Sequence, residues 1–247
     1  MKPPDGPSIS PDLLDFPRHE ARIDSRPPAL ESSTDLGRGE STGVRQWRSS
    51  SRSPSKVADV TGRIVVGYAL LASLATGIAI ALRDGVPWVL PTTPWLSLGP
   101  AMSLAVSAVL GLALALALVL WTRVSVLRFD WARRLHLELR PIARRLTATQ
   151  IVLLAGFSSL GEELLFRGLL QPWLGVLPVA LLFGICHQLP GPSRWVWVGW
   201  ATIVGTALGA IFAATGSLLG ALLAHGLINA ANLAFLRNYK PIDGPQP

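Results

Sequence analysis

Two adjacent glutamates, Glu162 and Glu163, lie deep in an apolar stretch of the chain that also holds Arg167. An ionisable side chain at membrane depth is costly unless it is paired, so such residues usually serve a function. Glu163 and Arg167 are four residues apart and meet on one face of a helix, where a guanidinium can bind a carboxylate through two hydrogen bonds. Glu162 points about 100° away and has no partner nearby in sequence. A carboxylate in that position is protonated, bound to a ligand, or a general base.

Three further polar side chains lie in two other apolar stretches. His187 ends the stretch that begins near residue 174, and His225 lies in the middle of the last one. Asn229 follows His225 by four residues and shares its helical face. Together with the glutamates and the arginine, these residues predict a polar cavity inside an apolar bundle. We interpret that cavity as the functional site.

The other histidines and the single cysteine are expected to have no chemical role. His19 lies in a polar segment and His136 on an amphipathic one, so we expect both to be solvated. Cys186 is the only cysteine, which excludes a disulfide within the chain. Because it lies in an apolar run, we expect it to be buried and inert.

The composition indicates a membrane protein. Half of the 247 residues are apolar and only 15% are charged, against about 25% in soluble domains. This disfavours both a disordered protein and an ordinary soluble enzyme. The net charge of +7 arises after residue 60, where 13 Lys and Arg face six acids. Since these cations flank apolar runs and form no separate basic domain, no nucleic-acid partner is expected.

Six apolar runs predict an all-α, polytopic bundle of about six transmembrane helices, because about 20 apolar residues span the hydrocarbon. They cover residues 64–82, 101–121, 147–170, 174–187, 195–214 and 217–236. The fourth run is short for a full crossing. If it crosses, His187 lies near the cytoplasmic surface while Glu162 lies about 22 Å deep, so the two meet only if this run is tilted or re-entrant.

A basic segment, residues 122–146, separates the second and third runs. Its apolar residues recur every three or four positions, which predicts an interfacial amphipathic helix bent near Pro141. We divide the chain into a disordered cytoplasmic tail (1–57), two transmembrane helices with this segment (58–146) and a catalytic core (147–240).

The positive charges also predict the topology. The tail, residues 122–146, the loop with Arg194 and the C-terminus are basic, so all four are expected in the cytoplasm. The first residues hold no apolar run of the signal-peptide type, and the first span is expected to direct insertion. The pairs Gly205–Gly209 and Gly216–Gly220 predict close helix packing.

The polar residues resemble the signature of the CPBP family, the CAAX-protease and bacteriocin-processing (Abi) intramembrane endopeptidases. The matching elements are Glu162-Glu163-x-x-x-Arg167, Phe183-x-x-x-His187 and His225-x-x-x-Asn229, in the family's order and spacing. Each element alone is weak, but the three in order are specific. The resemblance covers roughly residues 147–236.

The resemblance implies a helical bundle around a polar cavity and a glutamate-type protease of the plasma or inner membrane. By analogy, Glu162 and His187 activate a water, and His225 and Asn229 stabilise the oxyanion. Glu163 and Arg167 form a supporting pair. The implied partners are a peptide or membrane-protein substrate and the lipid bilayer.

Several alternatives remain open at this stage. No cofactor is expected, yet two histidines and a glutamate are also a zinc donor set. A non-catalytic immunity or scaffold protein of the same fold is one different reading, and a small transporter with Glu162 as its proton carrier is another. The sequence leaves the substrate, its prenylation and the oligomeric state undecided.

Overall fold

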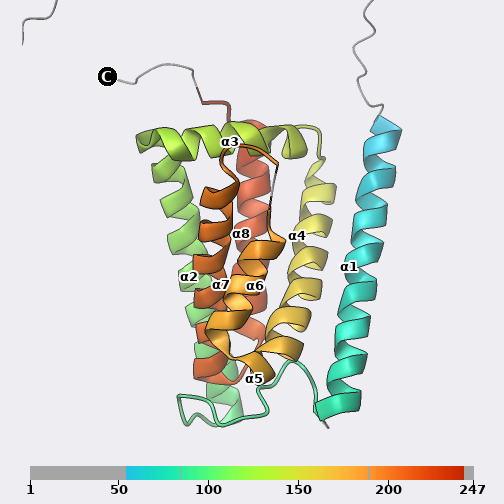
Figure 1. Cartoon of the computed structure of the whole chain (residues 1–247), viewed down its shortest axis with the longest axis vertical. Helices are drawn as coiled ribbons and strands as arrows, with labels where there is room; N and C mark the ends of the chain where they lie inside the picture. Colours follow the sequence, from blue (N-terminus) through green and yellow to red (C-terminus); the bar gives the residue numbers. More distant parts are fainter. Residues whose placement is uncertain (1–53, 84, 189, 242–247) are drawn as a thin grey trace, which may run out of the picture. The chain divides into compact units, whose positions relative to one another are not determined.

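The computed structural model describes residues 54–83, 85–188 and 190–241, and they form a helical bundle (Figure 1). The predicted tail therefore lies outside the described residues except for its last positions, where the first helix begins. In chain order the helices are α1 (Pro54–Arg83), α2 (Pro100–Arg128), α3 (Asp130–Ala143), α4 (Ala148–Glu163), the π-helix η1 (Leu164–Leu170), α5 (Gln171–Leu174), α6 (Val176–Cys186), α7 (Arg194–Thr215) and α8 (Leu219–Asn238). The all-α prediction is confirmed.

Four helical segments are long and apolar enough to cross a membrane: Ala58–Arg83, Pro100–Arg128, Arg194–Thr215 and Leu219–Asn238. Large apolar side chains on them point outward, as in Leu70, which is 66% exposed. Such a surface suits lipid and not water, and the chain is an integral membrane protein. The predicted third run (147–170) consists of α4 and η1 in succession, the short α5 follows it, and the fourth run contains the 11-residue α6. The number of crossings stays a prediction.

The basic segment 122–146 is not a single helix. Its first part continues α2 to Arg128, Phe129 is extended, and α3 begins at Asp130. Pro141 lies inside α3, which continues to Ala143. Figure 1 shows α3 running across one end of the bundle, roughly perpendicular to the long helices. That placement fits an amphipathic helix whose apolar face covers the bundle.

Two expectations about individual residues are wrong. Cys186 is exposed, because the last turn of α6 turns it away from the bundle. His136 is buried at 4% exposure, its Nε2 lies 3.0 Å from the backbone oxygen of Tyr239, and its ring packs edge-on against Phe235. Both errors have the same origin, since the sequence does not show which face of a helix meets its neighbours.

The buried His136 makes stability depend on pH. Burial lowers the pKa of its imidazole below the ordinary value of 6.5. A depressed pKa stabilises the fold at neutral pH, and this contribution is lost as the pH falls through and below 6.5, because the unfolded chain then binds the proton more readily. We therefore expect the melting temperature in detergent to fall between pH 7.5 and 5.5 by more in the wild type than in H136Q. Equal falls in the two proteins would contradict this role.

Glycines bring the helices close together, as predicted. A Cβ on Gly220 would collide with the backbone oxygen of Ser107, so α8 touches α2 directly. The Ser107 hydroxyl accepts a hydrogen bond from the Gly220 N–H (2.8 Å) and donates one to the oxygen of Ser217 (2.9 Å). Gly216 has another role: its φ of 74° ends α7 in a left-handed turn.

Candidate active site

The site is built where α4 gives way to the π-helix η1. Thr147 and Gln150 form a capping box that starts α4. Glu162 and Glu163 are the last two residues of α4 and are 8% and 0% exposed. The wider π-turns of η1 follow at once and carry Arg167. Such local departures from α-helix are frequent at functional sites, because they re-aim side chains that a regular helix would stagger.

The predicted ion pair between Glu163 and Arg167 is present and fully buried. Arg167 Nη1 donates to Glu163 Oε1 at 2.7 Å, and Nη2 donates to the backbone oxygen of Gly205 at 2.9 Å. Glycine leaves room for the guanidinium there, since a Cβ would lie 3.3 Å from Nη2, closer than an ordinary van der Waals contact. The guanidinium also stacks over the Phe183 ring, with its carbon 4.5 Å from the centroid. Three different helical segments thus hold this arginine.

Glu163 has a second partner that the sequence did not predict. The same Oε1 atom lies 2.7 Å from His225 Nδ1. An ionised carboxylate only accepts hydrogen bonds, so Nδ1 carries the proton and donates it. Glu163 therefore connects Arg167 to His225 and fixes the orientation of the imidazole.

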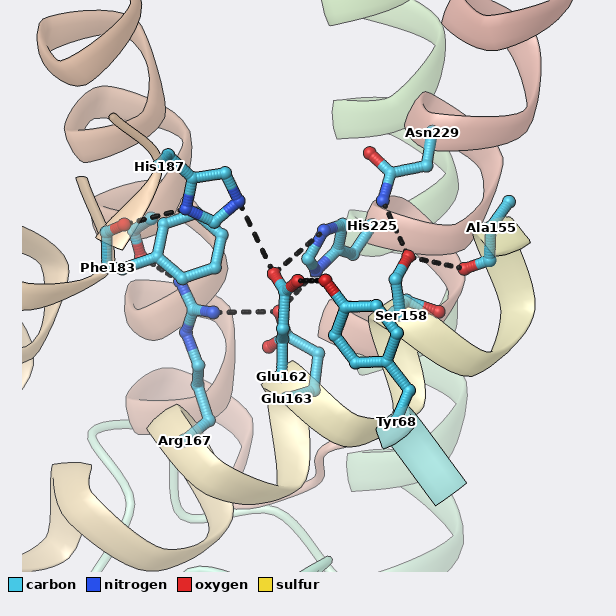
Figure 2. Close-up of polar contacts among 12 residues, drawn as sticks. Tyr68, Ala155, Ser158, Glu162, Glu163, Arg167, Phe183, His187, His225 and Asn229 are labelled. Atoms are coloured by element: carbon cyan, nitrogen blue, oxygen red, sulfur yellow. Dashed lines mark hydrogen bonds and ion pairs between the residues drawn. The ribbon is translucent and has the colours of Figure 1, made fainter. Parts of the chain in front are cut away.

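Glu162 lies at the centre of the cluster (Figure 2). Its Oε1 accepts a hydrogen bond from the Tyr68 hydroxyl at 2.8 Å. Its Oε2 lies 3.5 Å from His187 Nε2 and 3.7 Å from His225 Nε2, and no other side chain in the described part of the chain gives this buried oxygen a hydrogen bond. One carboxylate oxygen is held, and the other faces two imidazole nitrogens.

His187 reaches Glu162 because α6 is short. Its 11 residues rise only about 16 Å, so the helix ends beside Glu162 and not at the surface expected for a full crossing. The chain then continues toward α3, where Ser193 donates a hydrogen bond to Glu138 at 2.8 Å. His187 Nδ1 donates to the Phe183 oxygen at 2.7 Å, which directs Nε2 to the glutamate.

Asn229 lies on the other side of Glu162 from His187 in Figure 2. Its Nδ2 donates to the Ser158 hydroxyl at 3.2 Å. Ser158 precedes Glu162 by one turn of α4, so this contact ties α8 to the glutamate helix. The six residues singled out in the sequence therefore surround one region between α4, η1, α6 and α8.

Two polar contributors were missed from the sequence, Tyr68 and Ser158. Tyr68 belongs to the first span, which matched the family only as a generic apolar helix. The sequence holds only weak signals for the contribution of Tyr68. It is one of two tyrosines in the chain, and Gly161, just before the glutamates, is small enough for another helix to pack closely against it. Which span packs against α4 is decided by tertiary structure, and the sequence contains no local mark of it.

A mainly apolar cavity of about 90 Å³ lies between α2, α3, α7 and α8. Trp197 lines it and also contacts the His187 ring edge-on, with centroids 6.4 Å apart. Within the described part of the chain, no group of three or more His, Cys, Asp or Glu side chains is arranged to hold a metal ion.

Comparison with known proteins supports the resemblance. Residues 144–231 match the family model of type II CAAX prenyl endopeptidase Rce1-like proteins, in agreement with the predicted CPBP resemblance. An uncharacterized protein of Bacillus subtilis (strain 168), YpbD, is 30% identical over 91 residues, which cover 37% of this chain and 48% of that protein. The match thus spans about half the length of this curated relative. No solved structure matches the chain.

Proposed function

We propose, from the match of residues 144–231 to an endopeptidase family, that the protein is an intramembrane endopeptidase that hydrolyses peptide bonds with an activated water. The observation that carries this proposal is the placement of the buried Glu162 Oε2, which lies 3.5 Å from His187 Nε2 and 3.7 Å from His225 Nε2. A general base needs a carboxylate oxygen directed at the reacting water, and the two imidazole nitrogens beside this oxygen are placed to hold such a water.

In the proposed reaction, Glu162 Oε2 takes a proton from a water held against His187 Nε2. The water oxygen forms a bond to the scissile carbonyl carbon, and the carbonyl becomes a tetrahedral oxyanion. Glu162 then delivers the proton to the leaving nitrogen as the C–N bond breaks. The complete reaction consumes one water and regenerates the Glu162 carboxylate, so no further reactant is needed.

His225 and Asn229 are proposed to stabilise the oxyanion, each at about 3–4 kcal/mol for a well-placed donor. Because His225 donates from Nδ1 to Glu163, Nε2 is a donor only in the doubly protonated imidazolium. Glu163 accepts the Nδ1 hydrogen bond and thereby fixes the direction of Nε2. Arg167 in turn holds Glu163 in place, so the supporting pair also orients the oxyanion donor.

The direct test is cleavage of internally quenched peptides, prenylated and unprenylated, by the purified protein in detergent. We expect cleavage, less than one zinc per chain, and no inactivation by a chelator, because Glu162 and His187 provide the base and the polarised water themselves. Stoichiometric zinc that is lost together with activity, and restores it when added back, would contradict the glutamate mechanism. Glu162 would then act beside a metal-bound water.

Two other functions are distinguished by the same preparation. A scaffold or immunity protein needs only packing, so it would cleave no peptide in any lipid or detergent. A proton-coupled transporter would show uptake into proteoliposomes that depends on Glu162, without proteolysis. The completeness of the polar set favours catalysis over both.

We propose that the protein crosses the plasma or inner membrane six times with both termini in the cytoplasm. On a C186S background, which removes the exposed native thiol, single cysteines at Arg133 and Arg194 are expected to be labelled from the cytoplasmic side and one at Trp88 from the outer side. Labelling of the Arg133 position from outside would overturn this topology, because the segment 122–146 holds seven of the 13 Lys and Arg that follow residue 60.

A further inference from the structure

The site receives one hydrogen bond from outside the segment that matches the endopeptidase family. Tyr68 lies on α1, and its hydroxyl donates to Glu162 Oε1 at 2.8 Å. The family match begins at residue 144. The candidate catalytic glutamate is therefore held by a part of the chain that the match does not include.

The approach of α1 to the glutamate depends on small residues. A Cβ on Gly161 would lie 2.9 Å from the backbone oxygen of Tyr68, so only glycine lets the two helices come this close. Further along the same face of α1, Ala72, Ala75 and Ala79 are buried in the main apolar core. These alanines pack α1 against the bundle, so the Tyr68 hydroxyl is not needed for that packing.

The hydrogen bond distinguishes the two oxygens of Glu162. Oε1 is occupied by Tyr68, and the carboxylate plane is thereby fixed with Oε2 toward His187 and His225. The other charged groups of the cluster, Glu163 and Arg167, are bound to each other. Tyr68 is thus the neutral donor that orients Glu162, while the histidines remain available to the reacting water.

We infer that Tyr68 is a positioning residue for the general base: it holds Glu162 so that Oε2 meets the water. This inference rests on the proposed endopeptidase function and adds α1 to the catalytic machinery. A carboxylate freed at Oε1 would rotate about its last bond, and the reacting geometry would be populated only part of the time.

The test compares Y68F with the wild type in the quenched-peptide assay, with Y239F as the matched control, since these are the two tyrosines of the chain. We expect kcat of Y68F to fall roughly 10- to 100-fold, with KM within about twofold, at a temperature where the variant is fully folded, because the aromatic ring and the alanine contacts still hold α1 in place. Y239F should cleave at the wild-type rate.

Three outcomes would overturn the inference. One is a Y68F enzyme with wild-type kcat, another is a change confined to KM, and the third is a loss of activity that follows a loss of thermal stability. Each leaves the proposed function intact as long as the wild type cleaves and E162Q does not. If the wild type itself does not cleave, the proposed function has failed, and Tyr68 has no base to position.

Discussion

Replacement of Arg167 with alanine is expected to destabilise the protein by about 3–5 kcal/mol, the cost of leaving a buried charge without its partner. The side chain is 0% exposed, as is Glu163, to which it is bound at 2.7 Å. The variant loses the ion pair, the hydrogen bond to the Gly205 oxygen and the contact with the Phe183 ring. Thermal unfolding in detergent measures the effect, and activity is expected to fall with it.

The chain contains a matched control for this variant. Arg63 follows Asp59 by four residues, the same order and spacing as Arg167 after Glu163, but both side chains are mostly exposed. Exposed pairs of this kind contribute about 0.5 kcal/mol or less, so R63A should melt close to the wild type. An R167A protein as stable as R63A would show that the buried pair does not support the fold.

A double variant separates the lost charge from the lost packing. E163Q/R167M removes both charges and keeps apolar volume at residue 167, so it should be more stable than R167A. We still expect it to be a poor enzyme, because His225 Nδ1 would lose the carboxylate that orients its ring. Equal destabilisation of the two variants would indicate that packing, and not the uncompensated Glu163, dominates.

The predictable part of the site followed from local spacing. Residues four apart in a helix share a face, and this was sufficient to anticipate the Glu163–Arg167 pair and the common face of His225 and Asn229. The presence of polar residues in apolar stretches was sufficient to locate the candidate active site along the chain. Both signals are contained within single helices, so they are visible before the fold is known.

The unpredicted part depends on which helices meet and at what depth. The length of α6 brings His187 to Glu162, and the packing of α1 on Gly161 brings in Tyr68. The π-turns of η1 have no composition that sets them apart from α-helix in this sequence. The burial of His136, on the face of α3 that packs against the end of α8, likewise follows from tertiary contacts alone.

Replacement of Glu162 with glutamine is expected to abolish hydrolysis while leaving the fold intact. Glutamine is nearly the same shape and can still accept the Tyr68 hydrogen bond at its oxygen, so helix packing should be preserved. It has no basic carboxylate, and the loss of a general base costs about 10²- to 10⁴-fold in rate. Because burial of a carboxylate is itself costly, E162Q should melt at or above the wild-type temperature.

The measurement that most directly tests the proposed mechanism is therefore kcat/KM for quenched-peptide cleavage by wild type and E162Q, purified side by side and assayed at a temperature well below the melting temperatures of both. We expect cleavage by the wild type and a rate at or near the uncatalysed background for E162Q. Cleavage by folded E162Q at the wild-type rate would show that Glu162 is not the base, and the proposed mechanism would be wrong.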